Sequence, residues 1–142
     1  MAAINPYLNF LGKTEEAFNF YKSIFKTEFS IFQRFSDSDH GANLPESDKD
    51  KIMHVSLPIG NSNILMGTDA LESAGHSITM GNNISLSVTA ESKEEADTLF
   101  NGLSTDGKID MPLEDTFWGA YFGMCTDKFG IQWMVNYDYP QN

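Results

Sequence analysis

Few side chains in this sequence have the chemistry of an active site, and His54 is the first of them. It lies in a strand-like run, residues 51–58. An imidazole in a strand can act as a general base, a metal ligand or a polar contact for a ligand. A histidine held by hydrogen bonds within its own sheet is the competing interpretation, and the sequence leaves both open.

Metal-binding spacings are absent from the sequence, which contains no His-x-His, Cys-x-x-Cys or His-Glu-x-x-His. A metal site would therefore have to be assembled from distant residues, with His54 and either Asp69 or Glu114 as the best candidates. Glu114 and Asp115 are adjacent, and neighbours in a strand point to opposite faces. These two carboxylates are therefore not expected to act as an acid and base pair.

Two further residues with reactive groups are expected to be structural. Cys125 lies in an apolar run with only Lys128 as a nearby cation, which favours a buried and inert thiol. Asp127 begins a turn and is expected to accept hydrogen bonds from its own backbone.

Large apolar side chains provide the other candidate binding surface. Phe117, Trp118 and Trp133 can form an aromatic wall for an apolar or planar ligand, and packing in the core or in a dimer interface is the alternative. Methionines that can line the same pocket, or fill the core instead, are Met66, Met80 and Met134.

The first half of the chain contains the elements that must position these groups. A short extended run at residues 7–10 precedes Thr14, which is a good helix N-cap. Apolar residues then recur at helical spacing on one face, at Ala17, Phe20, Tyr21, Ile24 and Phe25. Strand-like runs follow at residues 28–35, 51–58 and 63–67, with a polar loop at 36–50 and a tight turn at 60–62.

The second half repeats this order. Residues 83–89 alternate as a strand, Ser92 and Glu95 form a capping box, and a second helical stripe consists of Ala96, Leu99, Phe100 and Leu103. Strands are expected at residues 107–114, 119–126 and 131–137, with a turn at 127–130. Offsets of about 78 to 79 residues relate the halves, which indicates an internal duplication of a βαβββ module.

This duplication predicts an α+β fold in one domain. Residues 1–70 form the first module, residues 83–138 the second, and residues 71–82 join them. We expect the two modules to form a curved mixed sheet around a cleft, because the helices cover only one face of the strands.

Composition restricts the compartment and the partners. Nine Lys and Arg oppose twenty Asp and Glu, so nucleic acid and anionic membranes are not expected partners. The single cysteine excludes an internal disulfide, and no apolar run is long enough to cross a bilayer. A cytoplasmic protein is expected.

Several segments together resemble a known family. They are the opening Asn5-Pro6-Tyr7-Leu8-Asn9-Phe10, the helix-ending Phe20-Tyr21, the run from His54 to Met66 with Asp69, Thr116-Phe117-Trp118, and Asp127-x-Phe129-Gly130-x-x-Trp133. These segments span nearly the whole chain. The sequence resembles the PhnB-like branch of the vicinal oxygen chelate superfamily, which includes glyoxalases, bleomycin resistance proteins and dioxygenases.

The resemblance implies paired βαβββ modules, a homodimer and, in enzymatic members, a divalent metal held at four strand positions. Those positions fall on Pro6, Met66, Asn83 and Met134, and none is a good ligand for a hard cation. No cofactor is therefore predicted, although a divalent metal bound by other residues stays open. Some relatives are described as methyltransferases, but this chain has no glycine-rich dinucleotide turn and is too short for such a domain.

The predicted function is therefore the binding of an unidentified small organic molecule. The residues expected to line the pocket are Tyr7, Asn9, His54, Met66, Phe117, Trp118 and Trp133. Two alternatives remain: a metal-dependent lyase, isomerase or dioxygenase with unusual ligands, and a dimeric interaction module. Whether the modules pair within one chain or between chains is left open.

Overall fold

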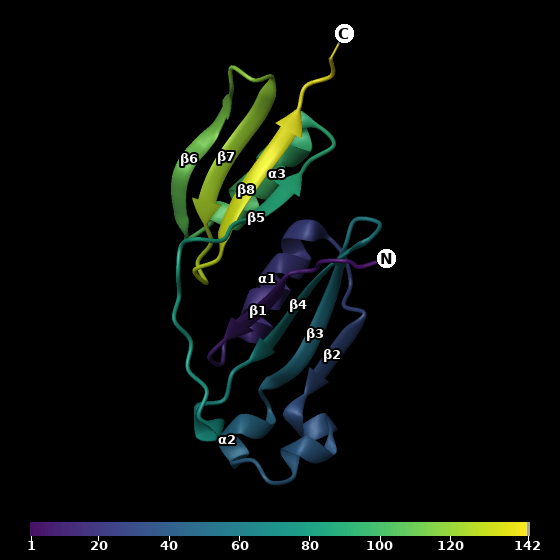
Figure 1. The fold of residues 1–142 in the computed structure, drawn as a ribbon, viewed down its shortest axis with the longest axis vertical. Coiled ribbons are helices and arrows are strands. Elements are labelled where there is room, and N and C mark those ends of the chain that lie inside the picture. Colours follow the sequence, from purple (N-terminus) through teal and green to yellow (C-terminus); the bar gives the residue numbers. More distant parts are fainter. Residues whose placement is uncertain (142) are drawn as a thin grey trace. The chain divides into compact units, whose positions relative to one another are not determined.

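The chain folds into two compact units, each built as one βαβββ module (Figure 1). This computed structural model describes residues 1–141, apart from the side chain of residue 40. The first unit is Met1–Thr79 and the second begins at Met80, within the segment that was expected to join the modules. The duplication read from the sequence is thus confirmed as two four-stranded sheets, each with its own helix.

The first unit contains a mixed sheet in the order β1-β4-β3-β2. Strand β1 is parallel to β4, whereas β3 is antiparallel to both β4 and β2. The elements are β1 (Tyr7–Phe10), α1 (Thr14–Phe25), β2 (Ile31–Arg34), α2 (Glu46–Lys49), β3 (Ile52–Ile59) and β4 (Asn63–Asp69). Three short 3-10 turns lie at Phe35–Asp37, Asp39–Gly41 and Glu72–Ala74.

The second unit repeats this topology in the order β5-β8-β7-β6, again with its first and last strands parallel. Its elements are β5 (Leu86–Thr89), α3 (Lys93–Ser104), β6 (Lys108–Asp115), β7 (Ala120–Thr126) and β8 (Gln132–Asp138). The Ser92 half of the predicted capping box is confirmed, since the Glu95 N–H donates to Ser92 Oγ at 3.0 Å. Glu95 Oε1 accepts at 3.0 Å from the N–H of Glu91, the residue before the N-cap, and not from that of Ser92. All four residues of the predicted α3 stripe are buried.

Helix α1 begins differently from the prediction. Thr14 is the first residue of the helix and not its N-cap. Lys13 holds the N-cap position, and its side chain makes no capping hydrogen bond. Thr14 instead donates from its N–H and from Oγ1 to Asp69 Oδ1, at 3.1 and 2.7 Å. A carboxylate at the end of β4 therefore accepts hydrogen bonds from the first residue of α1. No local sequence pattern predicts this contact.

Each helix packs on one face of its own sheet, where a glycine lets it approach. A Cβ built on Gly67 would lie 2.4 Å from Phe18 Cε1, so the ring of Phe18 occupies the place of a side chain on β4. Phe18 is fully buried, although the predicted stripe omitted it and named Phe20, which is only half-buried. Gly123 of β7 accommodates Phe100 of α3 in the same way.

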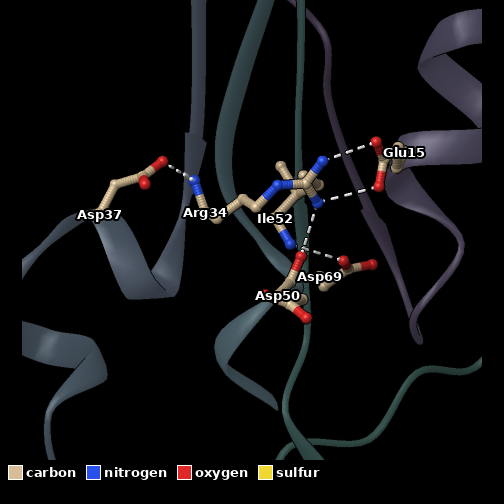
Figure 2. Close-up of polar contacts among 6 residues, drawn as sticks. All are labelled: Glu15, Arg34, Asp37, Asp50, Ile52 and Asp69. Carbon is tan, nitrogen blue, oxygen red and sulfur yellow. Dashed lines mark hydrogen bonds and ion pairs between the residues drawn. The ribbon is translucent and has the colours of Figure 1, made fainter. Parts of the chain in front are cut away.

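A bidentate ion pair joins the elements at one end of the first sheet (Figure 2). The Arg34 guanidinium donates to both carboxylate oxygens of Glu15, at 2.9 and 2.7 Å, and also to the carbonyl oxygen of Asp50 at 2.7 Å. The hydrogen bond from Arg34 lowers the pKa of Glu15. This contact ties β2 to α1 and to the turn before β3.

Residues 36–50 were expected to form a loop, and they form short helical turns that are fixed to the neighbouring segment. Asp48 is buried and accepts from Lys51 Nζ at 2.8 Å and from Ser73 Oγ at 2.5 Å. The two segments that flank β3 and β4 are therefore joined. No helix within residues 1–141 has the length and apolar character needed to cross a bilayer.

Candidate functional site

The face of the first sheet opposite α1, called here the open face, carries four of the predicted pocket residues. Gly67 and its partner Leu8 define the α1 side, so Tyr7 and its partner Met66 point the other way. Asn9 follows on the same face, two residues after Tyr7. His54 joins them, because Val55 pairs with Gly67 and its neighbours in β3 point away from α1.

Three polar side chains on the open face form one hydrogen-bonded chain. Tyr7 Oη lies 2.9 Å from His54 Nδ1, and His54 Nε2 lies 2.8 Å from Ser56 Oγ. The Tyr7 ring also lies against the imidazole, with 5.6 Å between ring centroids. Both ring nitrogens of His54 are therefore engaged, and the ring orientation is fixed from two sides.

The tautomer of His54 decides which hydroxyl of this chain, Tyr7–His54–Ser56, donates within it, and Tyr7 also has a hydrogen bond with Thr68. If neutral His54 carries its proton on Nε2, Tyr7 donates to Nδ1 and the Ser56 hydroxyl is free to donate. If the proton is on Nδ1, Ser56 donates to Nε2 and the Tyr7 hydroxyl is free. Only the second tautomer leaves the hydroxyl of the exposed Tyr7 as a donor, which suits recognition of a carbonyl or carboxylate oxygen.

The exposure of its side chains limits what the Tyr7–His54–Ser56 chain can do chemically. Ser56 is only 4% exposed, whereas Tyr7 is 43% exposed, so a ligand reaches Tyr7 first. Desolvation raises the pKa of Tyr7, which keeps its hydroxyl protonated near neutral pH. A nucleophile must contact its substrate, so the buried Ser56 is better placed to orient His54 than to attack.

Asp69 does not join His54 in a metal site. It lies on the α1 side of the sheet, and it accepts from the Thr14 N–H, from Thr14 Oγ1 and from the Ile52 N–H, the last at 2.8 Å (Figure 2). Both carboxylate oxygens are thus used within the fold. The suggestion that Asp69 and His54 share a cation is wrong, because the pairing of β3 with β4 puts them on opposite faces of the sheet.

Among the side chains described in residues 1–141, no three His, Cys, Asp or Glu residues gather to hold a metal ion. Of the four positions that the resemblance assigned to metal ligands, Pro6 accepts a hydrogen bond from the Met66 N–H through its backbone carbonyl. Met66 and Met134 offer thioethers, and Asn83 is exposed. This donor set does not fit a hard divalent cation.

Trp133 was expected to line the pocket, but it is in the core of the second unit. It is 2% exposed, pairs with the buried Cys125, and donates from Nε1 to Asp127 Oδ2 at 2.8 Å. Asp127 Oδ1 accepts from the N–H groups of Phe129 and Ile131, which confirms Asp127 as a turn residue. The Asp-x-Phe-Gly-x-x-Trp motif is therefore a structural device that closes the turn before β8.

Phe117 and Trp118 lie at the tip of the β6–β7 hairpin. Phe117 is 97% exposed and Trp118 is 54% exposed, and their rings contact each other edge to face at 5.0 Å between centroids. The turn itself is closed by Thr116, whose Oγ1 donates to the Ala120 carbonyl oxygen. Phe117 does not pack in the core, and it presents apolar surface that a ligand or another protein could contact.

The remaining reactive groups of the second unit are placed as expected. Cys125 is buried, and desolvation together with Asp127 raises the pKa of its thiol to about 11. Glu114 and Asp115 pair with Phe122 and Tyr121 and so lie on opposite faces.

The sequence did not indicate a hollow of about 480 Å³ in the second unit. Glycines and polar residues line it, among them Gly107, Lys108, Lys128 and Gln132. None of the predicted pocket residues lines it. Because glycines and turn residues form its walls, hydrophobic patterning carried no signal for it.

Comparison with known proteins shows that the sequence matches a protein family. The model of the family described as 3-demethylubiquinone-9 3-methyltransferase matches residues 2–136. Protein YjdN from Escherichia coli (strain K12) is 32% identical over 142 residues, covering 94% of this chain and 93% of that protein.

Solved structures agree with this match. PA1353 from Pseudomonas aeruginosa is 40% identical, with a TM-score of 0.84 over 97% of this chain and 98% of that one. A protein from Bacillus cereus, titled putative 3-demethylubiquinone-9 3-methyltransferase, PhnB protein, is 34% identical with a TM-score of 0.77, over 96% and 99% of the two chains. A glyoxalase/bleomycin resistance protein/dioxygenase family enzyme from Burkholderia phytofirmans PsJN is 17% identical, with a TM-score of 0.62 over 96% and 100%, and shares the fold.

Proposed function

Because the chain belongs to the family described as 3-demethylubiquinone-9 3-methyltransferase, the PhnB-like branch of the vicinal oxygen chelate superfamily, we propose that it binds a small organic molecule on the open face of its first sheet. The supporting observation is the Tyr7–His54–Ser56 chain, a set of polar groups that is fixed in orientation and accessible at Tyr7. Asn9 and Met66 flank it. Convergent polar groups beside apolar ones are typical of ligand sites.

The ligand that this face suits carries an oxygen acceptor beside an apolar or aromatic part. The Tyr7 hydroxyl would donate to the acceptor, and Met66 and the Tyr7 ring would contact the apolar part. Methyl transfer is not part of the proposal. The sheets described within residues 1–141 are four-stranded and mixed with one helix each, unlike the doubly wound parallel sheets that hold nucleotide cofactors.

The test is a fragment screen with aliphatic and aromatic carbonyl and carboxylate compounds, read by backbone amide NMR shifts. We expect hits to move the amides of Tyr7, His54 and Met66, and we expect His54→Ala to weaken them at least tenfold. His76→Ala is the matched control, since His76 is exposed and its Nδ1 accepts only a local hydrogen bond from the Leu71 N–H. Hits that bind His54→Ala as tightly as the wild type would refute the assignment.

The proposal includes two features expected from the sequence. The protein binds its ligand without a metal, and it is a cytoplasmic homodimer. Binding should survive chelator treatment, and elemental mass spectrometry should find no stoichiometric metal. Affinity that vanished with chelation would favour the metal-dependent enzyme instead.

The exposed aromatic tip supports a second function, an interaction module. Phe117 and Trp118 present apolar surface that a second copy of the chain would cover. Sedimentation should then show a dimer for the wild type and a monomer for the double variant Phe117→Ser, Trp118→Ser. A wild-type monomer at micromolar concentration would exclude this role.

A further inference from the structure

Three methionines stand in a row across the second sheet, on the face away from α3. Met124 of β7 pairs directly with Met111 of β6 on one side and with Met134 of β8 on the other. Directly paired residues point to the same face of a sheet. The register of β6 against β7 shifts on both sides of Met111, so its face follows from the pairing with Met124 and not from alternation along β6. Gly123 accommodates Phe100 of α3, so its neighbour Met124 points away from the helix.

The row lies within reach of solvent and of a shared ion. Met111 is 46% exposed and the other two are half-buried. Neighbouring strands are about 4.8 Å apart, so the outer methionines are roughly 10 Å apart and must both lean toward Met124. An unbranched side chain with three rotatable bonds allows this convergence at little cost.

From this juxtaposition we propose that Met111, Met124 and Met134 bind one soft monovalent cation, Cu(I) or Ag(I), through their three sulfur atoms. Thioethers are soft donors that select such ions over Mg²⁺, Ca²⁺ or Zn²⁺. The adjacent side chains on this face, Thr126 and Gln132, offer hard oxygen donors that do not compete for the ion.

Charge in the second unit favours a cation at this face. The sequence from residue 80 onward contains three Lys against ten Asp and Glu. The lysine nearest the row along the sheet is Lys108, which pairs with Thr126, and its Nζ lies 3.5 Å from Asp110 Oδ1. The methionine row and the proposed ligand face belong to different sheets.

Another soft donor in this unit, Cys125, is excluded by position. Its neighbour Met124 points to the open side, so the thiol points toward α3, and it is 1% exposed. A variant without this thiol should therefore bind the ion as the wild type does.

The experiment is a titration of the full chain with Ag(I) in chloride-free buffer, and with Cu(I) without oxygen. Stoichiometry is read by native mass spectrometry, affinity by competition with a Cu(I) chelator, and the site by NMR of ¹³C-labelled methionine methyl groups. The chain has seven Met. We expect one ion per chain, with shifts confined to the three methyl groups of the row.

Variants separate the site from other sulfur atoms. Met124→Leu preserves volume and should lower the affinity at least tenfold with an unchanged circular dichroism spectrum. Met66→Leu and Cys125→Ala are the controls and should stay within twofold of the wild type. Loss of binding in Cys125→Ala, wild-type affinity in Met124→Leu, equal shifts of all the methyl groups or absence of binding would each overturn the site.

Discussion

Replacing Asp69 by Asn tests the junction between α1, β3 and β4. The buried carboxylate accepts three hydrogen bonds, two from Thr14 and one from the Ile52 N–H. Asn has the same shape but only one acceptor oxygen, so its NH₂ group must face at least one of these donors. A buried donor without a partner costs about 1–3 kcal/mol, and hydrogen bonds to a charged group contribute about 1.5–3 kcal/mol each. Since the contacts are not additive, we expect a loss of about 2–4 kcal/mol.

The assay must report on the first unit, because both tryptophans lie in the second. Urea unfolding followed by far-ultraviolet circular dichroism gives the free energy, and amide hydrogen exchange shows whether Thr14 and Ile52 lose protection. Asp138→Asn is the control, since Asp138 is exposed and accepts from the Asn136 side chain, and it should change stability by less than about 0.5 kcal/mol. If Asp69→Asn stays within that range and both amides remain protected, the carboxylate does not join these elements.

Two further predictions follow from close contacts. Gly67→Ala places a Cβ 2.4 Å from Phe18 Cε1 and should destabilise the first unit by about 1–3 kcal/mol in urea unfolding, whereas Gly81→Ala, which has room, should be nearly neutral. The hydrogen bond from Tyr121 Oη to Asp97, with burial, raises the pKa of Tyr121 to about 12. The stabilisation from this pair is complete below the unfolded pKa of 10 and is lost as the pH rises through 12. Ultraviolet titration should show a tyrosine that ionises near 12, and Asp97→Asn should return its pKa toward 10.

Sequence patterns predicted the elements whose stabilising contacts are local. Residues only a few positions apart make the α3 stripe, the Ser92 cap and the turn at Asp127. The spacing of these residues in the sequence therefore predicts each feature. The start of α1 depends on Asp69, and the burial of Phe18 depends on a missing side chain at Gly67. Such long-range contacts leave no periodic signal, and that is why both were missed.

Some residues of the candidate site were likewise predicted from the sequence, and others were missed or misplaced. The chemistry of their side chains placed His54 and Met66 among the expected pocket residues, and the pairing of strands then put them on one face with Tyr7. Ser56 was missed although it lies two residues after His54 in the same strand, a spacing that puts both side chains on one face. Trp133 was misplaced, since a strand pattern alone does not tell which face a helix covers, and that face holds Trp133 in the core.

The two helix starts also imply an order of folding. The partners that begin α3 are three residues apart, so they can meet in a chain that is otherwise unfolded. Those that begin α1 are 55 residues apart, and their contact requires the closure of a long loop. We therefore expect α3 to form early and α1 to form only when β4 docks, an order that pulsed amide exchange during refolding would reveal. A chain emerging from the ribosome would accordingly hold an incomplete first helix until Asp69 has been made and has left the exit tunnel.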